Sequence, residues 1–559
     1  MKYWVLKPLT AAGVGVLVAT FSVMLTGPVT MIAAPPKLVV VVVIDQFPQV
    51  FLDRFSEHFV DGGFNLFLRR GAVFSDARMR HATSSTGSGH AVVLSGSYAS
   101  ENGIIGNDWL DRETYEGIYC ASDPGSLSLG GDGAAGRSPR LFLATTVGDQ
   151  WKTFRSPHSR VIAISDKDRA AVMLGGKLAD AAYWSVNGRF VTSDYYLYEL
   201  PRWVEDFNDS GRVESYFGKV WDRLLPEDAY ATQGVDDFLG ESPGNGLGRT
   251  FPRTINGGGD EISVDFYHAF YASPFCNEVL AEFAKEAIVR EALGQREVTD
   301  ILAISFSGND KVGHSFGPDS HEVMDVTLRT DRILADLFGF IDDRVGLEHA
   351  TIVLTADHGV MPIPEKILLA RDRLPAGRVE IGDLLQAVER DLDDRFGPLE
   401  NGGRWLAAVP GNVYLRESAL GSKGLARIDI EDVVKSSLLK RPEVQAAFTR
   451  TQLVHGKAGG LLGPYVANSF YEGRSGDVVF VLKAFHFLNY HPGSRTGTDH
   501  GSPYSYDTHV PLLWFGVGVE PGVYTRPVGV EDLAPTLTRI LGVTPPVLSR
   551  GRDLFPAVR

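Results

Sequence analysis

Cysteine is scarce in this chain of 559 residues, which contains only Cys120 and Cys276. Structural zinc sites and iron–sulfur clusters need several cysteines close together, and neither cysteine here has a second soft ligand nearby. The scarcity therefore argues against a cysteine-based metal site. In an exported protein the two thiols can pair, but their distance in sequence leaves a disulfide open, and two buried free thiols are the alternative.

Positively charged residues are fewer than negatively charged ones. The chain has 54 Lys and Arg against 69 Asp and Glu, which gives a formal net charge of −15. Nucleic acids and anionic membrane surfaces are bound by basic patches, so this balance argues against both as partners. An acidic protein still binds a small anionic substrate when metal ions and a few cations make its pocket locally positive.

Only one apolar run approaches the length of a membrane span, from Leu9 to Leu25. Lys2 and Lys7 precede it and small residues follow it, the order typical of an export signal. We therefore expect residues 1–34 to direct the protein to the periplasm or the outside, or to anchor it in the membrane if they stay uncleaved. Residues 35–559 are then the exported catalytic part.

Five short segments, far apart in the chain, place carboxylate, imidazole or hydroxyl groups where they can bind metal. One of them, TGSGHA, holds Thr86 and His90. The others hold six candidate ligands, Asp45, Asp310, His314, Asp357, His358 and His500. Asp and His without Cys favour zinc or a neighbouring borderline metal. Six ligands suit two ions, and a metal pair can hold both the attacking and the leaving oxygen in phosphoryl or sulfuryl transfer.

β-branched apolar runs recur along the chain, and they are typical of strands buried on both faces of a parallel sheet. These runs are Lys37–Ile44, Arg160–Ser165, Asp300–Phe306, Ala350–Thr355 and Pro511–Gly516. Helical patterns such as Val323–Asp343 fall between them. We therefore expect an α/β fold with a central, mostly parallel sheet covered by helices on both faces. Ligands bind such sheets beyond the carboxyl ends of strands, and the polar residues that follow strand ends here are Asp45, Lys167, Asp310 and Asp357.

Two regions interrupt the alternation of strands and helices. Residues 184–259 are rich in Tyr, Asp, Asn and Gly, and we expect a loop-rich insertion near the mouth of the site. Residues 365–492 carry a helical pattern of their own, and we expect a small α+β lobe there. Both would be insertions in one large catalytic domain.

A two-metal hydrolase needs an activated water or an activated side-chain oxygen. The segment ATSSTGSGHAVVLSG offers five hydroxyls, on Thr83, Ser84, Ser85, Thr86 and Ser88. A hydroxyl at a helix N-terminus is well placed, because the local field favours an alkoxide and an incoming phosphoryl group. The same hydroxyls can instead cap the helix. The residues alone do not choose among them.

A family resemblance makes that choice. The motifs IDQ, TGSGHA, GIIGNDW, SDKDR, GNDKVGHSFGP, TADHG and TDHGSPYSYD resemble, in this order, the alkaline phosphatase superfamily. Within it they are similar to the exported bacterial monoesterases with a threonine nucleophile, the phosphate-irrepressible alkaline phosphatases. The resemblance implies Thr86 as the nucleophile and a phosphate contact from Asn107. The family's proline is Ser88 here, and we expect a slightly looser turn without it.

The resemblance also implies two zinc ions per chain. It assigns one zinc to Asp45, Thr86, Asp357 and His358, and the other to Asp310, His314 and His500.

The segment SDKDR is the most discriminating of these motifs. In the family, a Lys and an Arg two residues apart grip the non-bridging oxygens of a dianionic phosphate monoester, and here they are Lys167 and Arg169. Arg gives phosphate two parallel hydrogen bonds, and Lys a compact charge; a surface charge cluster is the alternative. The resemblance thus implies zinc-dependent hydrolysis of a broad range of small phosphate monoesters through a phosphothreonine, with release of inorganic phosphate. A phosphodiesterase or nucleotide pyrophosphatase on the same scaffold is the alternative function.

Overall fold

The structure is a computed structural model and describes residues 35–131, 135–242, 244–489 and 496–555. The expected export segment lies outside the described residues. The chain divides into two units, Met1–Ala34 and Pro35–Arg559. Among the described helices, none combines the length and the apolar character needed to cross a membrane.

The core of the second unit is a sheet that, within the described residues, has eleven strands. Its centre consists of five parallel strands in the order β14 (Ala350–Thr355), β1 (Leu38–Ile44), β13 (Asp300–Phe306), β8 (Val161–Ser165) and β9 (Ala181–Val186). Every residue of the first four is buried, as the β-branched runs predict. The expected α/β fold with a mostly parallel sheet is confirmed.

The flanking strands of the sheet pair in antiparallel fashion, except that the edge strand β22 pairs in parallel with β2. On one side lie β21 (Leu512–Gly516), β2 (Ala72–Phe74) and β22 (Gly522–Tyr524), and on the other β10 (Arg189–Ser193), β6 (Ser122–Leu129) and β7 (Ala135–Arg137). The run at 511–516 is thus a sheet strand that runs against its neighbour β14. The sheet extends along β10 as far as Ser193, because the Phe, Val and Thr side chains of this strand are buried. The loop-rich region therefore begins after Ser193, later than the expected residue 184.

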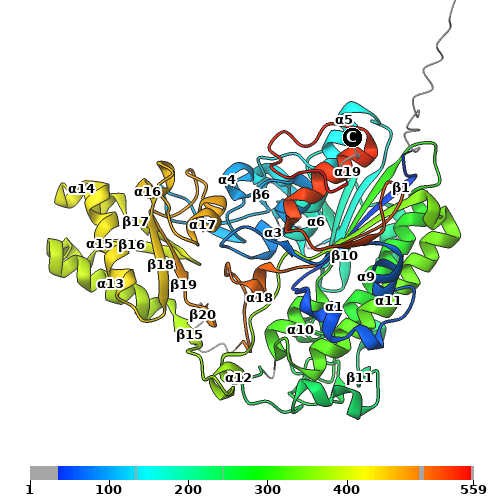
Figure 1. Cartoon of the computed structure of the whole chain (residues 1–559), viewed down its shortest axis with the longest axis horizontal. Coiled ribbons are helices and arrows are strands. Elements are labelled where there is room, and N and C mark those ends of the chain that lie inside the picture. The colour runs from blue at the N-terminus through cyan, green and yellow to red at the C-terminus, as the bar shows by residue number, and fades with distance from the viewer. Residues whose placement is uncertain (1–34, 132–134, 243, 490–495, 556–559) are drawn as a thin grey trace, which may run out of the picture. The chain divides into compact units, whose positions relative to one another are not determined.

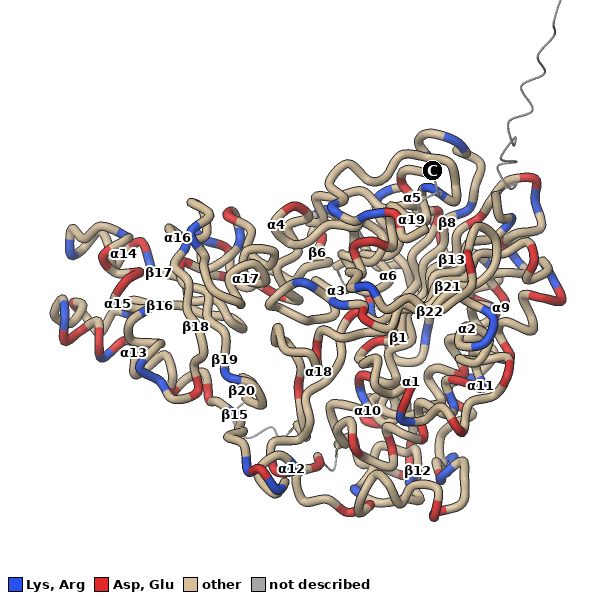
Figure 2. Tube along the Cα trace, viewed as in Figure 1, with Lys and Arg blue, Asp and Glu red and all other residues tan. Residues whose placement is uncertain are grey.

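Helices cover both faces of the sheet (Figure 1). On one face lie α3 (Thr86–Ser95) and α6 (Asp168–Gly175), and on the other α9 (Phe275–Arg290) and α11 (His321–Val345), which contains the expected helix at 323–343. In Figure 2 the central strands are mainly tan, and the blue and red that mark charged residues lie mostly on helices and loops. Cys120 and Cys276 are both buried free thiols, so the disulfide left open by the sequence is absent.

A small α+β lobe, residues 377–489, has a hydrophobic core of its own. Its sheet has the order β16 (Leu406–Val409), β17 (Asn412–Leu415), β19 (Val478–Leu482) and β18 (Val444–Thr449), and its helices include α13 (Ile381–Phe396) and α15 (Arg427–Leu439). A strand pair, β15 (Gly377–Glu380) and β20 (His486–Asn489), completes it. The fully buried Asp477 fastens the lobe to the rest of the unit through Arg112, 2.6 Å away.

Candidate functional site

Three carboxylates meet at one edge of the central sheet. Asp45 follows β1 and Asp357 follows β14, and the two strands are in register, with Val43 opposite Thr355. Asp310 follows β13, on the other side of β1, in the first turn of α10 (Gly308–Phe316). All three side chains are buried. The structure thus places the predicted carboxylates together, because the ends of neighbouring parallel strands share an edge.

Asp45, Asp357 and His358 form a compact group. The His358 Nε2 atom lies 3.5 Å from Asp45 Oδ1 and 3.3 Å from Asp357 Oδ2. One ligand atom from each residue lies within 4.8 Å of the others. Asp45 Oδ1, Asp357 Oδ2 and His358 Nε2 are all buried, with no hydrogen-bond partner among the described residues. Buried polar atoms rarely go unpaired, so the group fits a cation, and its oxygen and nitrogen donors suit zinc.

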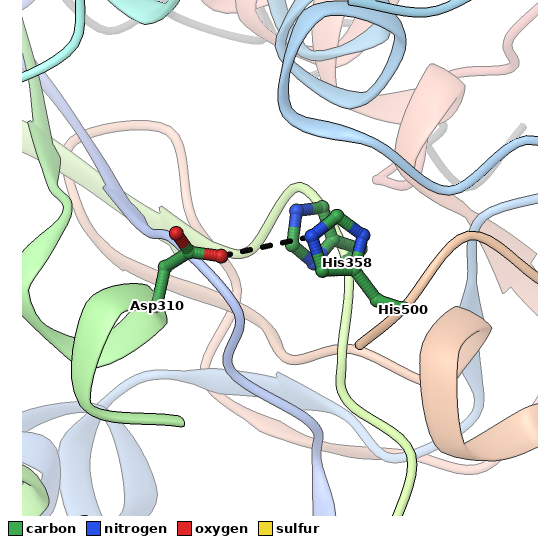
Figure 3. A group of neighbouring side chains, drawn as sticks. All are labelled: Asp310, His358 and His500. Atoms are coloured by element: carbon green, nitrogen blue, oxygen red, sulfur yellow. Dashed lines mark ion pairs between the residues drawn. The ribbon is translucent and has the colours of Figure 1, made fainter. Parts of the chain in front are cut away.

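A second group adjoins the first. Figure 3 shows Asp310 facing the stacked rings of His358 and His500, whose centroids are 3.6 Å apart. His500 Nε2 lies 3.7 Å from Asp310 Oδ1, and His314 Nε2 lies 3.2 Å from the same oxygen. The six Asp and His residues singled out in the sequence therefore form one continuous cluster, in which His358 stands between the two groups.

The imidazoles of His358 and His500 are in the form that binds metal. Burial lowers the pKa of His358 to about 4. Burial, followed by the neighbouring His358, lowers the pKa of His500 to about 3. Both rings are therefore uncharged near neutral pH, with a nitrogen lone pair available.

Lys167 is the cation that the structure places among the carboxylates. Its Nζ atom lies 2.7 Å from Asp45 Oδ2 and 2.6 Å from Asp310 Oδ2. Burial raises the pKa of Asp45, and the nearby Asp310 and Asp357 raise it further. Although burial alone would also raise the pKa of Asp310, Lys167 holds it well below its usual range. One lysine thus faces a group of three buried carboxyl groups.

Thr86 is the first residue of α3, with Ser85 as the N-cap. Its hydroxyl oxygen lies 3.4 Å from Lys167 Nζ and 3.4 Å from Arg169 Nη2. The Ser88 hydroxyl donates to the Thr83 carbonyl at 2.7 Å and accepts from the Ser85 amide at 3.4 Å. Hydrogen bonds of Ser88 thus link the turn at the position where the family has proline, and the looser turn stays a prediction.

Asn107 and Arg169 complete the surroundings of Thr86. The Gly87 amide donates to Asn107 Oδ1 at 2.7 Å, and no described residue accepts from Asn107 Nδ2, which leaves that amide group as a donor. The Arg169 guanidinium lies 3.4 Å from the Tyr119 hydroxyl, which itself donates to Asp168. Two cations and one amide thus surround a hydroxyl at a helix N-terminus, an arrangement suited to an anion.

Gln46 and Asp499 are two site residues that the sequence reasoning missed. Gln46 follows Asp45 in a left-handed conformation, with φ of 61°, and donates to Asp310 Oδ1 at 3.0 Å and, through its backbone, to Asp357 Oδ1 at 3.2 Å. Asp499 Oδ1 lies 3.7 Å from His314 Nδ1 and 3.9 Å from His500 Nε2. Their only sequence signal was the position of each beside a candidate ligand.

His90 is a supporting residue. Its ring nitrogens contact the Thr86 carbonyl oxygen at 2.9 Å and the Ser305 hydroxyl at 2.8 Å. The nitrogen next to Thr86 also lies 3.1 Å from Asp357 Oδ2. His90 therefore positions the start of α3 against the strand end that carries Asp357.

The chain matches the model of the family described as "Type I phosphodiesterase / nucleotide pyrophosphatase" over residues 39–419. It is similar to alkaline phosphatase PhoV of Synechococcus elongatus, with 32% identity over 93% of this chain and 92% of the relative. It is also similar to alkaline phosphatase PafA of Elizabethkingia meningoseptica, with 32% identity over 100% and 99% of the two chains. The crystal structure of wild-type PafA matches with a TM-score of 0.86 and 31% identity, covering 93% of this chain and 98% of that one.

The contact between α3 and the end of β14 leads to a prediction about Gly89. A methyl group on Gly89 would lie 2.4 Å from the Asp357 carbonyl oxygen and 2.8 Å from its Cβ. Because alanine must push α3 or Asp357 aside, we expect Gly89→Ala to lower the free energy of unfolding by about 1–3 kcal/mol. It should also weaken the binding of a metal ion by Asp357. Urea unfolding and competition with a chelator measure the two effects.

Gly339→Ala is the matched control for this substitution. Gly339 lies in the middle of α11, and a methyl group there meets nothing within 4 Å. Alanine should raise stability there by up to about 1 kcal/mol, because it favours the helix. If Gly89→Ala behaved like Gly339→Ala, the close packing of α3 on Asp357 would be refuted.

Proposed function

This chain belongs to the type I phosphodiesterase / nucleotide pyrophosphatase family and is an alkaline phosphatase that hydrolyses phosphate monoesters, and on that premise we propose that Thr86 is its nucleophile, beside two zinc ions. One observation carries the proposal: Thr86 Oγ1 lies 3.4 Å from both Lys167 Nζ and Arg169 Nη2, at the N-terminus of α3. Two cations and the field of a helix N-terminus favour an anionic oxygen and an incoming phosphoryl group.

In the proposed reaction, the Thr86 oxygen attacks phosphorus in line with the ester oxygen. The bond from Oγ1 to phosphorus forms as the bond to the leaving oxygen breaks; Thr86 loses its proton and the departing alcohol gains one. Water then hydrolyses the phosphothreonine, which restores the Thr86 hydroxyl and releases inorganic phosphate. Two bound zinc ions would supply Lewis-acid stabilisation of the attacking and leaving oxygens.

The residues that would hold the zinc ions are the clustered acids and histidines. The proposed first site consists of Asp45, Asp357, His358 and Thr86, and the second of Asp310, His314 and His500. The buried atoms of Asp45, Asp357 and His358 that make no hydrogen bond to the described residues support the first site. The approach of His314 and His500 to Asp310 supports the second. Asp499, which lies beside both histidines, would add a further carboxylate there.

Lys167, Arg169 and Asn107 would hold the non-bridging oxygens of the phosphoryl group. As the leaving bond breaks, negative charge spreads over these oxygens, and preorganised donors stabilise it most in a water-poor site. A diester has one charge fewer and a second substituent on phosphorus. The two cations therefore favour monoesters.

We infer that the protein is exported to the periplasm or beyond. The charged start with Lys2 and Lys7, followed by the apolar run Leu9–Leu25, supports this inference. Fractionation of cells that produce the full chain tests it, and recovery of all activity in the cytosol would overturn it.

The Thr86 hydroxyl is the proposed nucleophile. Thr86→Ala should abolish covalent phosphorylation and nearly all turnover, because no oxygen remains at the N-terminus of α3 beside Lys167 and Arg169. Thr83→Ala and Ser85→Ala, which remove neighbouring hydroxyls of the same turn, should reduce turnover far less. Mass spectrometry of acid-quenched enzyme should find phosphate on Thr86, and phosphate on another hydroxyl would refute the assignment.

Lys167 and Arg169 are the proposed basis of the preference for monoesters. Removing a charge-assisted hydrogen bond costs about 1.5–3 kcal/mol, or roughly one to two decades in rate. Lys167→Ala combined with Arg169→Ala should therefore lower kcat/KM for an aryl monoester by roughly two to four decades, and for the matching diester much less.

Zinc content serves as the control for the double variant, because Lys167 also contacts Asp45 and Asp310. With zinc retained, equal losses on monoester and diester would mean that the pair does not set the preference for monoesters. Diester hydrolysis that exceeds monoester hydrolysis in the wild type would favour the phosphodiesterase alternative.

A further inference from the structure

A single cavity joins the catalytic residues to the lobe. Its volume is about 320 Å³, within the range of small-molecule sites, about 300–1,000 Å³. Thr86, Lys167 and His500 line it on the side of the central sheet. Val479–Leu482 of β19 and His486–Leu488 of β20, which we call the lobe wall, line it on the side of the lobe. The space beside a phosphate bound at Thr86 therefore ends at the lobe wall.

The lobe wall is largely apolar. Leu482 and Leu488 are partly exposed and pack at the margin of the lobe's own core. Among the described residues, the lobe contributes no Lys, Arg, Asp or Glu to the lining of this cavity. Partly exposed leucines gain free energy when an apolar ligand covers them, because both surfaces leave water.

The lobe wall is fixed to the loop that carries His500. The Tyr504 hydroxyl donates to the Leu482 carbonyl at 2.8 Å. The Phe485 amide donates to the Tyr506 hydroxyl oxygen at 3.1 Å, and these two rings stack with centroids 5.5 Å apart. Because both tyrosines follow His500 closely in the chain, the wall is held at a set distance from the proposed zinc site. A preformed wall costs little ordering on binding.

Charge is distributed unevenly along the cavity. Its Lys and Arg residues within the described chain are Lys167, Arg169 and Lys311, all outside the lobe. Its acids are Asp108, Asp310, Asp499 and Asp507, and these also lie outside the lobe. One phosphoryl group at Thr86 takes up the first two cations. A second anionic group placed toward the lobe would meet an uncharged wall.

We propose that the lobe wall is the leaving-group subsite of the enzyme and that it selects phosphate monoesters of uncharged alcohols that carry an apolar group. The proposal rests on the proposed monoester reaction at Thr86 and names its substrate class. Small alkyl esters leave the wall uncovered, and esters with a second anion place that anion against an uncharged wall, where it loses water without gaining a charged partner. Both are therefore poorer substrates.

Two matched pairs of esters test the proposal on the zinc-loaded wild-type enzyme. Ethyl phosphate and 2-phenylethyl phosphate release similar primary alcohols and differ in the apolar ring. Propyl phosphate and 3-phosphonooxypropanoate differ in a carboxylate at the far end. We expect kcat/KM to be about tenfold higher for the phenylethyl ester than for ethyl phosphate, and several-fold lower for the carboxylate than for propyl phosphate.

Leu482→Ser combined with Leu488→Ser identifies the surface responsible. The double variant should lose about tenfold more kcat/KM on the phenylethyl ester than on ethyl phosphate. The inhibition constant of inorganic phosphate should change little, because phosphate does not reach the wall. Leu439→Ser combined with Leu461→Ser, at exposed leucines of the lobe outside this cavity, is the matched control and should keep the wild-type ratio.

The results separate this proposal from the function on which it rests. Equal kcat/KM for the two members of each pair in the wild type would overturn the subsite, and so would equal losses on both esters in the double variant. If the double variant does not fold, the wild-type ratios alone decide. Turnover of none of the four esters would instead overturn the proposed monoester reaction.

Discussion

The repulsion among three buried carboxylates is the constraint on which the rest of the site depends. Asp45, Asp310 and Asp357 are almost fully removed from water, and like charges repel strongly in such an environment. The fold places them together because their strands are neighbours. Lys167 balances part of their charge, and the zinc ions that we propose balance the rest. The resulting positive balance lets an acidic protein bind a dianionic phosphoryl group.

The two parts of the second unit contribute different properties to this site. The central sheet and its helices supply the charged and metal-binding side chains. Every acid and histidine of the cluster lies at a strand end or in a loop or helix beside one. The lobe supplies a neutral wall across the cavity. The residues that would act on phosphorus are therefore different from those that would recognise the ester group. Substitutions in the lobe wall can change the choice of substrate without altering the proposed metal ligands.

The sequence predicted the centre of the fold well, because runs such as Lys37–Ile44 bury on both faces wherever they occur. It also placed Asp45, Asp310 and Asp357 together, since parallel strands end at one edge. It did not reveal Gln46 or Asp499, whose roles depend on contacts with residues far away in the chain. Likewise, the start of the loop-rich region was placed too early. The polar and aromatic residues of β10 do not indicate a strand by themselves, and only its pairing with neighbouring strands shows one. The role of Ser88 depends on the Thr83 carbonyl, which only the folded turn brings close.

In the proposed reaction, the clustered acids and histidines hold two metal ions without which turnover stops. Elemental analysis of purified, extensively dialysed enzyme, with monoester turnover measured on the same samples, tests this requirement most directly. We expect two zinc ions per chain, loss of turnover as a chelator removes them, and recovery when zinc is restored. Full turnover in enzyme that contains one ion or none would contradict the requirement.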